Sequence, residues 1–401
     1  MGLRAQILIG DSVAKQEVVR AERNFLPQQY ETTGVLEINH NYLPAQFSDR
    51  DEILAQIREV VIRGDFTLGR EVDRLEDEFA TLVGAKHAVG VGSGTDALLL
   101  SLKALGIGQG DEVITTPYTF FATVGAIATA GAKPVFVDIR EDYNLDPERV
   151  EAAVTPRTRA ILPVHWSGKP CDMDPIAELA SRRGIAVVED ACHAIQATYK
   201  GRPAGTLGTL GCFSFHPLKN LNVWGDGGII ATNSDELAAS LRLLRNHGLV
   251  SREQCAVFAY NSRLDTIQAV VARHLLGKLD HITESRVAHA AYFDDRLRRI
   301  PQIKIPEREP WVRHVYHLYV IRCERRDALQ RHLVAHGVDA KVHYPIPMHL
   351  QPAAAFLGHA PGDFPVCERI VEEVLSLPVH EFITRDQQYR VVALIESFYR
   401  S

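Results

Sequence analysis

Short apolar runs alternate with amphipathic stretches of about three helical turns between residues 87 and 191. The apolar runs, which we expect to be strands, lie at residues 87–91, 111–116, 133–138, 159–166 and 185–191. The stretches between them with helical periodicity lie at residues 95–106, 121–131, 146–154 and 173–184. Short strands separated by amphipathic helices are typical of a mostly parallel sheet covered on both faces. The pattern therefore predicts a doubly wound α/β domain.

The flanking segments predict the remaining parts of the chain. Helices are expected on either side of the sheet region, at residues 51–64, 70–84 and 235–248, and as one or two long helices at 263–300. Beyond Pro301 the pattern predicts a strand, a helix, a strand and two helices, at residues 314–323, 324–337, 338–345, 367–377 and 385–400. We therefore predict three parts, which are an N-terminal arm at 1–50, a large domain at 51–286 and a smaller α+β domain at 287–401.

Composition and charge narrow the classes of partner. The chain has 401 residues, of which 46% are hydrophobic, and a formal net charge of -6 argues against general nucleic-acid binding. It has no signal-peptide pattern and no apolar run of the roughly 18 residues that cross a bilayer. Its six cysteines form no CxxC pair and its 17 histidines include no HExxH spacing, so no metal site is predicted. We expect a cytoplasmic protein that binds a small molecule, without a membrane or nucleic-acid partner.

Lys219 stands in a segment whose pattern singles it out. An apolar run at residues 212–215 is followed by a short polar turn that contains Lys219, and then by the glycines Gly225, Gly227 and Gly228. A lysine held among apolar neighbours loses the solvation of its ammonium form, so its pKa falls and the neutral amine becomes a nucleophile toward a carbonyl. Most lysines are solvated surface groups, which is the alternative at this position.

A glycine-rich turn at residues 89–100, VGVGSGTDALLL, leads from a strand directly into a helix. Such a turn presents free N–H groups and the positive end of the helix dipole to a phosphate. The same spacing occurs in dinucleotide folds, which place an acidic residue at the end of the following strand. Asp111 and Glu112 precede that strand instead, so a nicotinamide cofactor is the weaker interpretation. A tight turn without a ligand stays open as an alternative.

Two carboxylates end the strand at residues 185–191, where open α/β sheets bind their ligands. Of Glu189 and Asp190, Asp190 is the better candidate for a site. A carboxylate beside a pyridine nitrogen keeps that nitrogen protonated, and a protonated ring accepts electrons from a carbanion. A nucleophilic lysine, a phosphate cradle and this carboxylate on one sheet together indicate pyridoxal 5'-phosphate (PLP).

Eight motifs in the chain resemble those of the DegT/DnrJ/EryC1/StrS family of sugar aminotransferases, in the family's order from about Thr67 onward. They are SGTDAL, TFFAT, VVEDACHA, FSFHPLKNLNVWGDGG, LRNHG, YNSRLD, HYPIPMHLQ and LSLP. The resemblance implies a PLP-dependent transferase of fold type I, with a large, mostly parallel seven-stranded-type sheet domain and a smaller α+β C-terminal domain. It also implies L-glutamate as the amino donor, pyridoxamine 5'-phosphate as the intermediate cofactor form, and a homodimer with shared active sites.

The resemblance assigns roles to individual residues. Lys219 is expected to bind the cofactor as a Schiff base and to move the proton during transfer, and Asp190 to pair with the pyridinium nitrogen. The other expected cofactor contacts are Gly94, Thr95 and Ser214 at the phosphate, Phe120 on the ring face, His193 near the ring hydroxyl, and Asn261 reaching the neighbouring subunit's phosphate. A core position for Phe120 is its alternative. Relatives with histidine in place of Lys219 catalyse dehydration, so the lysine favours amino transfer.

The segment at residues 343–351 resembles enzymes that aminate C3 of nucleotide-linked keto-sugars, which favours a 3-keto over a 4-keto substrate. The candidate substrate-binding residues are Arg263, His343, Tyr344 and His349, together with residues 245–248. A structural role remains the alternative for each histidine, and Trp224 is a candidate for shaping the substrate pocket. A ketocyclitol aminotransferase of an aminoglycoside-type pathway is the second hypothesis. A non-catalytic regulatory protein that binds PLP is the third.

Overall fold

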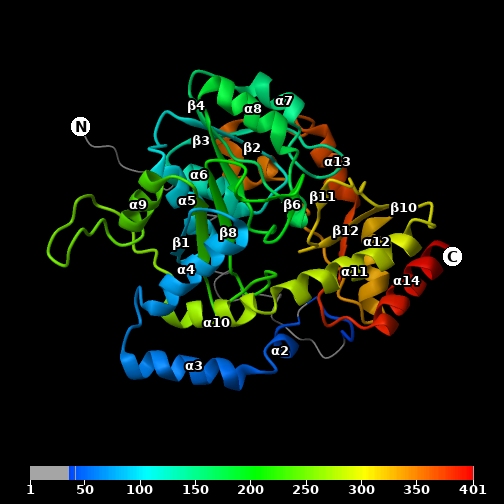
Figure 1. Ribbon diagram of the computed structural model, residues 1–401. Coiled ribbons are helices and arrows are strands. Elements are labelled where there is room, and N and C mark those ends of the chain that lie inside the picture. Colours follow the sequence, from blue (N-terminus) through cyan, green and yellow to red (C-terminus); the bar gives the residue numbers. More distant parts are fainter. Residues whose placement is uncertain (1–35, 41, 401) are drawn as a thin grey trace, which may run out of the picture.

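The computed structural model describes residues 36–40 and 42–400, which contain a seven-stranded sheet (Figure 1). Its strands are β1 (His87–Val91), β2 (Glu112–Thr115), β3 (Lys133–Phe136), β4 (Thr158–Ile161), β5 (Ala186–Asp190), β8 (Leu210–Ser214) and β9 (Gly228–Thr232). The order across the sheet is β1-β9-β8-β5-β4-β2-β3, and β9 runs antiparallel to both of its neighbours. The other pairs are parallel, which confirms the predicted doubly wound arrangement.

Helices cover both faces of this sheet because its strands are apolar on both sides. The helices of this part are α3 (Arg50–Arg63), α4 (Arg70–Val83), α5 (Gly94–Ala104), α6 (Phe121–Ala130), α7 (Pro147–Ala153), α8 (Met173–Arg183), α9 (Asp235–Leu244) and α10 (Thr266–Leu276). Successive residues of β8 point to opposite faces, so Cys212 packs in one core with Leu98, whereas Phe213 packs in the other with Phe79. Among the described residues, no helix is both long and apolar enough to cross a membrane.

The C-terminal part consists of a small antiparallel sheet and the helices around it. Its sheet has the order β10-β12-β13, formed by β10 (Ile303–Lys304), β12 (Tyr319–Cys323) and β13 (Val374–Leu377). Its helices are α11 (Leu279–Leu297), α12 (Arg326–Ala335), α13 (Pro365–Glu373) and α14 (Arg385–Arg400). Helix α11 is continuous across residues 286 and 287, where the sequence predicted the domain boundary. A further short sheet joins β11 (Val312–Arg313), β6 (Thr198–Tyr199) and β7 (Arg202–Pro203).

Three predicted elements differ from the structure. The helix expected at 367–377 ends at Glu373, and Val374–Leu377 forms β13, which pairs with β12. A short run that is buried on both faces has no periodicity to separate strand from helix. The strand expected at 338–345 is absent, since this segment makes only single bridges at Val338 and Lys341. The strand expected from residue 314 begins at Tyr319, because Val315 instead bonds to the loop after β4.

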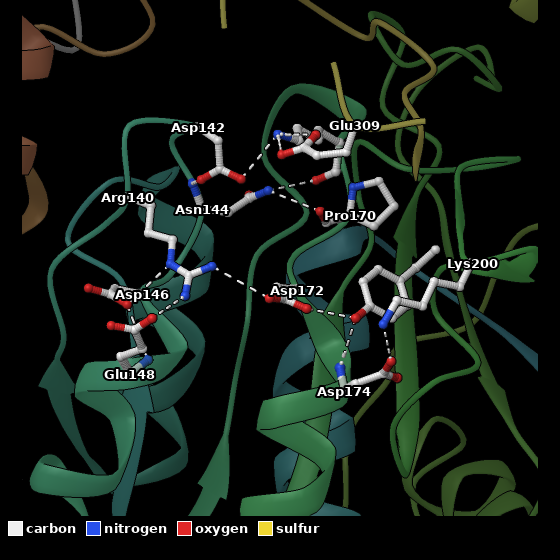
Figure 2. Close-up of polar contacts among 12 residues, drawn as sticks. Arg140, Asp142, Asn144, Asp146, Glu148, Pro170, Asp172, Asp174, Lys200 and Glu309 are labelled. Atoms are coloured by element: carbon white, nitrogen blue, oxygen red, sulfur yellow. Dashed lines mark hydrogen bonds and ion pairs between the residues drawn. The ribbon is translucent and has the colours of Figure 1, made fainter. Parts of the chain in front are cut away.

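Ion pairs and amide hydrogen bonds fix the loop after β4 (Figure 2). Lys169 is 4% exposed, and its ammonium pairs with Asp142 at 3.1 Å and with Glu309 at 2.8 Å. Asn144 donates to the carbonyl oxygens of Lys169 and Pro170, at 3.1 and 3.2 Å. A buried cation is stable only when it is paired, so these two carboxylates hold the loop in place.

Arg245 and Glu76 form a buried ion pair that joins α9, α4 and β1. Both residues are 5% exposed, and Arg245 Nη1 donates to Glu76 Oε1 and to the carbonyl oxygen of Gly90, the latter at 2.8 Å. Glu76 Oε1 also accepts the amide of Gly90 at 2.9 Å. The guanidinium of Arg245 is therefore used inside the fold.

We expect Arg245→Met to lower the free energy of unfolding by about 3 to 5 kcal/mol, because it removes the buried cation that pairs with Glu76 and leaves, among the described residues, only the Gly90 amide and the longer contact with Arg242. Denaturant unfolding measures the change. Arg242→Met is the matched control, since Arg242 lies 3.6 Å from Glu76 with its side chain 44% exposed, and it should cost less than about 1 kcal/mol. Equal losses in the two variants would show that the buried pair has no special weight.

Candidate active site

A cavity of about 330 Å³ lies where β1, β5 and β8 end. The residues predicted for cofactor and substrate that line it are Gly94, Thr95, Phe120, Asp190, His193, Ser214, Lys219, His343 and Tyr344. Parallel strands deliver their carboxyl ends to one edge of a sheet, and ligands of such sheets bind beyond that edge. The topology therefore brings together most of the residues that the sequence singled out.

Lys219 is half-buried and faces the cavity from the turn after β8. Its amide donates to the carbonyl oxygen of His216 at 2.8 Å, and its own carbonyl oxygen accepts from Asn222 Nδ2 at 2.9 Å and from the Tyr42 hydroxyl at 3.3 Å. Burial lowers the pKa of Lys219 below its usual value, an effect that Cys192 and Asp190 oppose. A fixed amine with a lowered pKa is a nucleophile toward an aldehyde.

Asp190 is 6% exposed and its carboxylate is fixed on both oxygens. Thr123 Oγ1 donates to Oδ2 at 2.8 Å, and the amide of Cys192 donates to Oδ1 at 3.2 Å. Thr119 Oγ1 lies 2.6 Å from Thr123 Oγ1, so two hydroxyls in series support the carboxylate. Both Thr119 and Thr123 stand in the segment TFFAT, but no sequence pattern marked either as part of a site.

Glu189, the neighbouring carboxylate, is used within the fold. It is fully buried and accepts the amides of Gly205, Leu207 and Gly208 at 2.8, 2.6 and 2.6 Å. His165 Nε2 lies 2.7 Å from the same carboxylate. Adjacent strand residues point to opposite faces, so only one of the two carboxylates reaches the cavity.

The N-terminus of α5 lies against the end of β8 in the cavity. Ser93 is the N-cap, and its Oγ accepts the amide of Asp96 at 3.0 Å. A Cβ added at Gly94 would lie 2.6 Å from Ser214 Cβ, so the close approach requires glycine there. The exposed Thr95 follows. The first amides of α5, the positive end of its dipole and the hydroxyls of Thr95 and Ser214 therefore lie where an anion can bind.

His193 contributes a neutral imidazole. It is 8% exposed, its Nδ1 has no hydrogen bond to any described residue, and its ring lies 4.3 Å from that of His317. Burial holds the pKa of His193 well below its usual value, and the positive charge of Lys219 adds to this effect. Leaving a buried nitrogen without a hydrogen bond costs free energy, so His193 Nδ1 is suited to bond with a polar group of a ligand.

Phe120, His343 and Tyr344 form another wall of the cavity. Phe120 is 47% exposed and its ring lies 5.8 Å from that of Tyr344. A position in the core, the alternative for Phe120, is therefore wrong. His343 Nδ1 lies 2.9 Å from Ser376 Oγ, and burial lowers the pKa of His343 to about 3.

Three predicted residues do not line the cavity. The first, Asn261, is exposed and forms a single backbone bridge with Asn246. The second, Arg263, donates from its Nη1 to the side-chain oxygen of the same Asn246 at 3.1 Å. His349 is 2% exposed, and its Nε2 lies 3.0 Å from Glu368 Oε1.

Arg245, a candidate for substrate binding, and Trp224, a candidate for shaping the substrate pocket, also lie outside the cavity. Arg245 is committed to Glu76, and Trp224 packs edge-on against Phe47 with ring centroids 5.5 Å apart. Neither side chain lines the cavity.

Several lining residues were not predicted from the sequence. They are His40, Tyr42, Arg286, His317, Lys341 and His380. They come from the N-terminal segment, from α11 and from the C-terminal part, and no motif marked them. Tyr42 stacks on His380 with ring centroids 4.9 Å apart, so the N-terminal segment forms part of the wall.

Potential metal ligands gather outside this cavity. Atoms of Asp49, Glu52 and His274 lie within 4.8 Å of one another. The ammonium of Lys278 already pairs with Asp49 there, and His274 Nε2 lies 2.7 Å from the same carboxylate.

The cavity residues fit PLP on their own chemistry. A lysine amine of lowered pKa, a fixed carboxylate and a helix N-terminus surround one space, and the unpartnered Nδ1 of His193 adds a site for a polar group. These are the group types that bind an aldehyde, a ring nitrogen and a phosphate.

A model of the DegT/DnrJ/EryC1/StrS aminotransferase family matches residues 48–396. The chain belongs to this family. It is therefore a PLP-dependent sugar aminotransferase of fold type I, as the resemblance implied.

Named relatives lie within the same family. A "pleiotropic regulatory protein" of Geobacillus stearothermophilus is 46% identical over 354 residues, 88% of this chain and 95% of that protein. The dTDP-3-amino-3,4,6-trideoxy-alpha-D-glucose transaminase of Streptomyces venezuelae is 46% identical over 352 residues, 87% of this chain and 92% of that protein. The solved structure of S. venezuelae DesV in complex with a ketimine intermediate has a TM-score of 0.89 and 44% identity, and the match covers 91% of this chain and 99% of that one.

The lowered pKa of Lys219 predicts a distinctive pH dependence of its reactivity. Below the ordinary lysine pKa of about 10.4, an amine with a lower pKa is neutral in a larger fraction of molecules. In the cofactor-free protein, trace acetylation with acetic anhydride at pH 7 should therefore favour Lys219 over the exposed Lys304. The ratio, measured by peptide mass spectrometry and normalised to its value at pH 11, should fall as pH rises. A ratio that does not change with pH would contradict the lowered pKa.

Proposed function

We propose that this enzyme transfers an amino group from L-glutamate to C3 of a nucleotide-linked 3-keto-sugar, in amino-sugar biosynthesis. The observation that carries the proposal is the convergence of Lys219, Asp190 and the N-terminus of α5 on one cavity. These groups bind an amino-transfer cofactor and leave the rest of the cavity for a substrate.

Bound PLP supplies an electron sink for negative charge that develops on a substrate carbon. In our proposal Lys219 Nζ would hold the cofactor, would take the proton from the α-carbon of the amino-acid donor in the first half-reaction, and would deliver a proton to C3 of the keto-sugar in the second. Asp190 holds the proton on the ring nitrogen, and the fixed position of its carboxylate comes from Thr123 and Cys192. The phosphate would lie between Ser214 and the first amides of α5, and His193 near the ring hydroxyl.

The name of a relative supports the acceptor class. The S. venezuelae protein is named for a sugar with an amino group at C3 and a dTDP group. The imidazole of His343 and the hydroxyl of Tyr344 line the cavity and suit hydrogen bonds to sugar hydroxyls. The G. stearothermophilus relative is named as a regulator, but the complete set of Lys219, Asp190 and Ser214 favours catalysis in this chain.

A substrate panel tests the acceptor. The pyridoxamine phosphate form of the purified enzyme is mixed with dTDP- and UDP-linked 3-keto-sugars, their 4-keto isomers and a ketocyclitol. We expect the absorbance of the pyridoxal form to return only with a 3-keto-sugar nucleotide. A return only with the 4-keto isomers or with the ketocyclitol would refute the proposed acceptor, and a protein that converts none of them would favour regulation.

We also propose that the enzyme acts as a homodimer in which each subunit lends Asn261 to the other's phosphate site. Asn261 is exposed and lies outside the cavity of its own chain. It follows a loop that extends away from the body after α9 (Figure 1), in which residues 251–258 are all exposed. The side chain of Phe258 at the end of this run is fully exposed at 103%. An apolar side chain in this position is suited to contact a second subunit.

Heterodimers test the shared site. Two differently tagged chains, one with Lys219→Ala and one with Asn261→Asp, are co-expressed and the mixed dimer is isolated. If the sites are shared, one site of the two is intact and about half of the wild-type activity remains. The matched control carries both substitutions in one chain with a wild-type partner, and it should be inactive. Activity in the control and not in the first dimer would show that each site is built from one chain.

A further inference from the structure

Lys341 lies on a cavity wall that the sequence motifs did not mark. Its backbone pairs with Ser376 of β13, with N–O distances of 3.1 and 2.7 Å. His343, two residues further along, is held to the same Ser376 by its Nδ1 at 2.9 Å. Both Lys341 and His343 line the cavity, which is the expected result for alternate residues of an extended segment.

The cavity has few charged side chains, and most of them are already engaged. Of the lining residues described, the cations are Lys219, Arg286 and Lys341, and the carboxylates are Asp190 and Asp226. Lys219 is needed for the cofactor. Arg286 is 2% exposed, donates to the carbonyl oxygens of Tyr316 and His317 at 3.2 and 3.3 Å, and pairs with Glu381 at 3.5 Å. The Nε and Nη2 atoms of Arg286 have no hydrogen bond to a described residue, but they are buried. Lys341, whose side chain is 32% exposed, is therefore the more accessible of these two cations to a ligand.

The ammonium of Lys341 has one weak partner among the described residues. Asp339 Oδ1 lies 3.4 Å away, longer than the 2.7–2.9 Å typical of a charge-assisted hydrogen bond. The other oxygen of Asp339 accepts the amide of His40 at 3.0 Å. The Lys341 side chain is 32% exposed. An ammonium carries three donors, so Lys341 keeps donors for a second anion.

Lys341 and Lys219 line the same cavity, and the charges of both act on the imidazole of His343. Burial is the main reason for the low pKa of His343, and the positive charges of Lys341 and Lys219 both lower it further. This imidazole lines the cavity and is held by Ser376 of the small sheet. Because that imidazole is neutral, it adds no second positive charge beside Lys341.

We propose that Lys341 is a substrate-binding residue whose ammonium binds an anionic oxygen of the substrate. This inference rests on the proposed function, in which both substrates enter one cavity in turn. The donor carries carboxylates and the sugar nucleotide carries a diphosphate, so either substrate supplies an anion. Among the described residues, Asp339 is the carboxylate that competes with this anion for the ammonium of Lys341. In this proposal Lys341 takes no part in proton transfer.

Binding of two unreactive probes to the holoenzyme tests the proposal. Glutarate stands for the amino-acid donor and dTDP for the nucleotide of the acceptor, and calorimetry gives the dissociation constant of each. Loss of a charge-assisted hydrogen bond weakens binding by about 10-fold to 100-fold. We expect this loss for at least one probe in Lys341→Met, with partial recovery in Lys341→Arg. The visible cofactor absorbance and the melting temperature should stay at their wild-type values.

Lys304→Met is the charge-matched control, because Lys304 is exposed on β10 and lies outside the cavity. Weaker glutarate binding alone identifies the donor carboxylate as the anion, and weaker dTDP binding alone identifies the diphosphate. Unchanged binding of both probes in Lys341→Met, or an equal loss in Lys304→Met, would overturn the assignment of Lys341 alone. If the wild-type enzyme binds neither probe, the anion site and the proposed substrates are both contradicted.

Discussion

The parallel pairing of β5 with β8 determines where the active site forms. In this register Asp190, the last residue of β5, lies beside Cys212 of β8. The chain then continues through Ser214 to the turn that carries Lys219, so the carboxylate and the amine leave the sheet at the same edge. The return strand β9 begins at Gly228, where a Cβ would lie 2.4 Å from the carbonyl oxygen of Ser93. The N-terminus of α5 therefore lies directly against the edge of the sheet from which Asp190 and Lys219 emerge.

The charge state of the site follows from burial. Desolvation favours the neutral forms of Lys219, His193 and His343, and each of these groups has a lowered pKa. Asp190 is fixed in position instead, because Thr123 and the amide of Cys192 donate hydrogen bonds to its two carboxylate oxygens. A lowered pKa increases the fraction of an amine or imidazole that is neutral at a given pH, and only the neutral form can accept a proton from carbon.

Sequence patterns predicted the features that depend on neighbouring residues in the chain. The features that depend on contacts between distant segments could not be predicted in this way. The alternation between residues 87 and 191 was sufficient to predict the parallel strands of the large sheet. Polar residues at or just after the end of an apolar run were sufficient to select Asp190 and Lys219, which both line the cavity. Thr123 and Lys341 carry no such mark, because their roles come from neighbours far away in the sequence. The segment at 374–377 was predicted as helix, since a run buried on both faces lacks the periodicity that separates the two states. Arg245 stood in a motif, yet its partner Glu76 lies on another helix.

Helix α11 passes without interruption from the large sheet's side of the molecule to the small sheet's side (Figure 1). It also carries Arg286, which lines the cavity and bonds to the backbone before β12. Because α11 is a single helix of 19 residues, the chain has no flexible linker at residues 286 and 287, where the sequence predicted a boundary between domains. One continuous element thus joins the cavity wall that contains Arg286 to the backbone that leads into the small sheet.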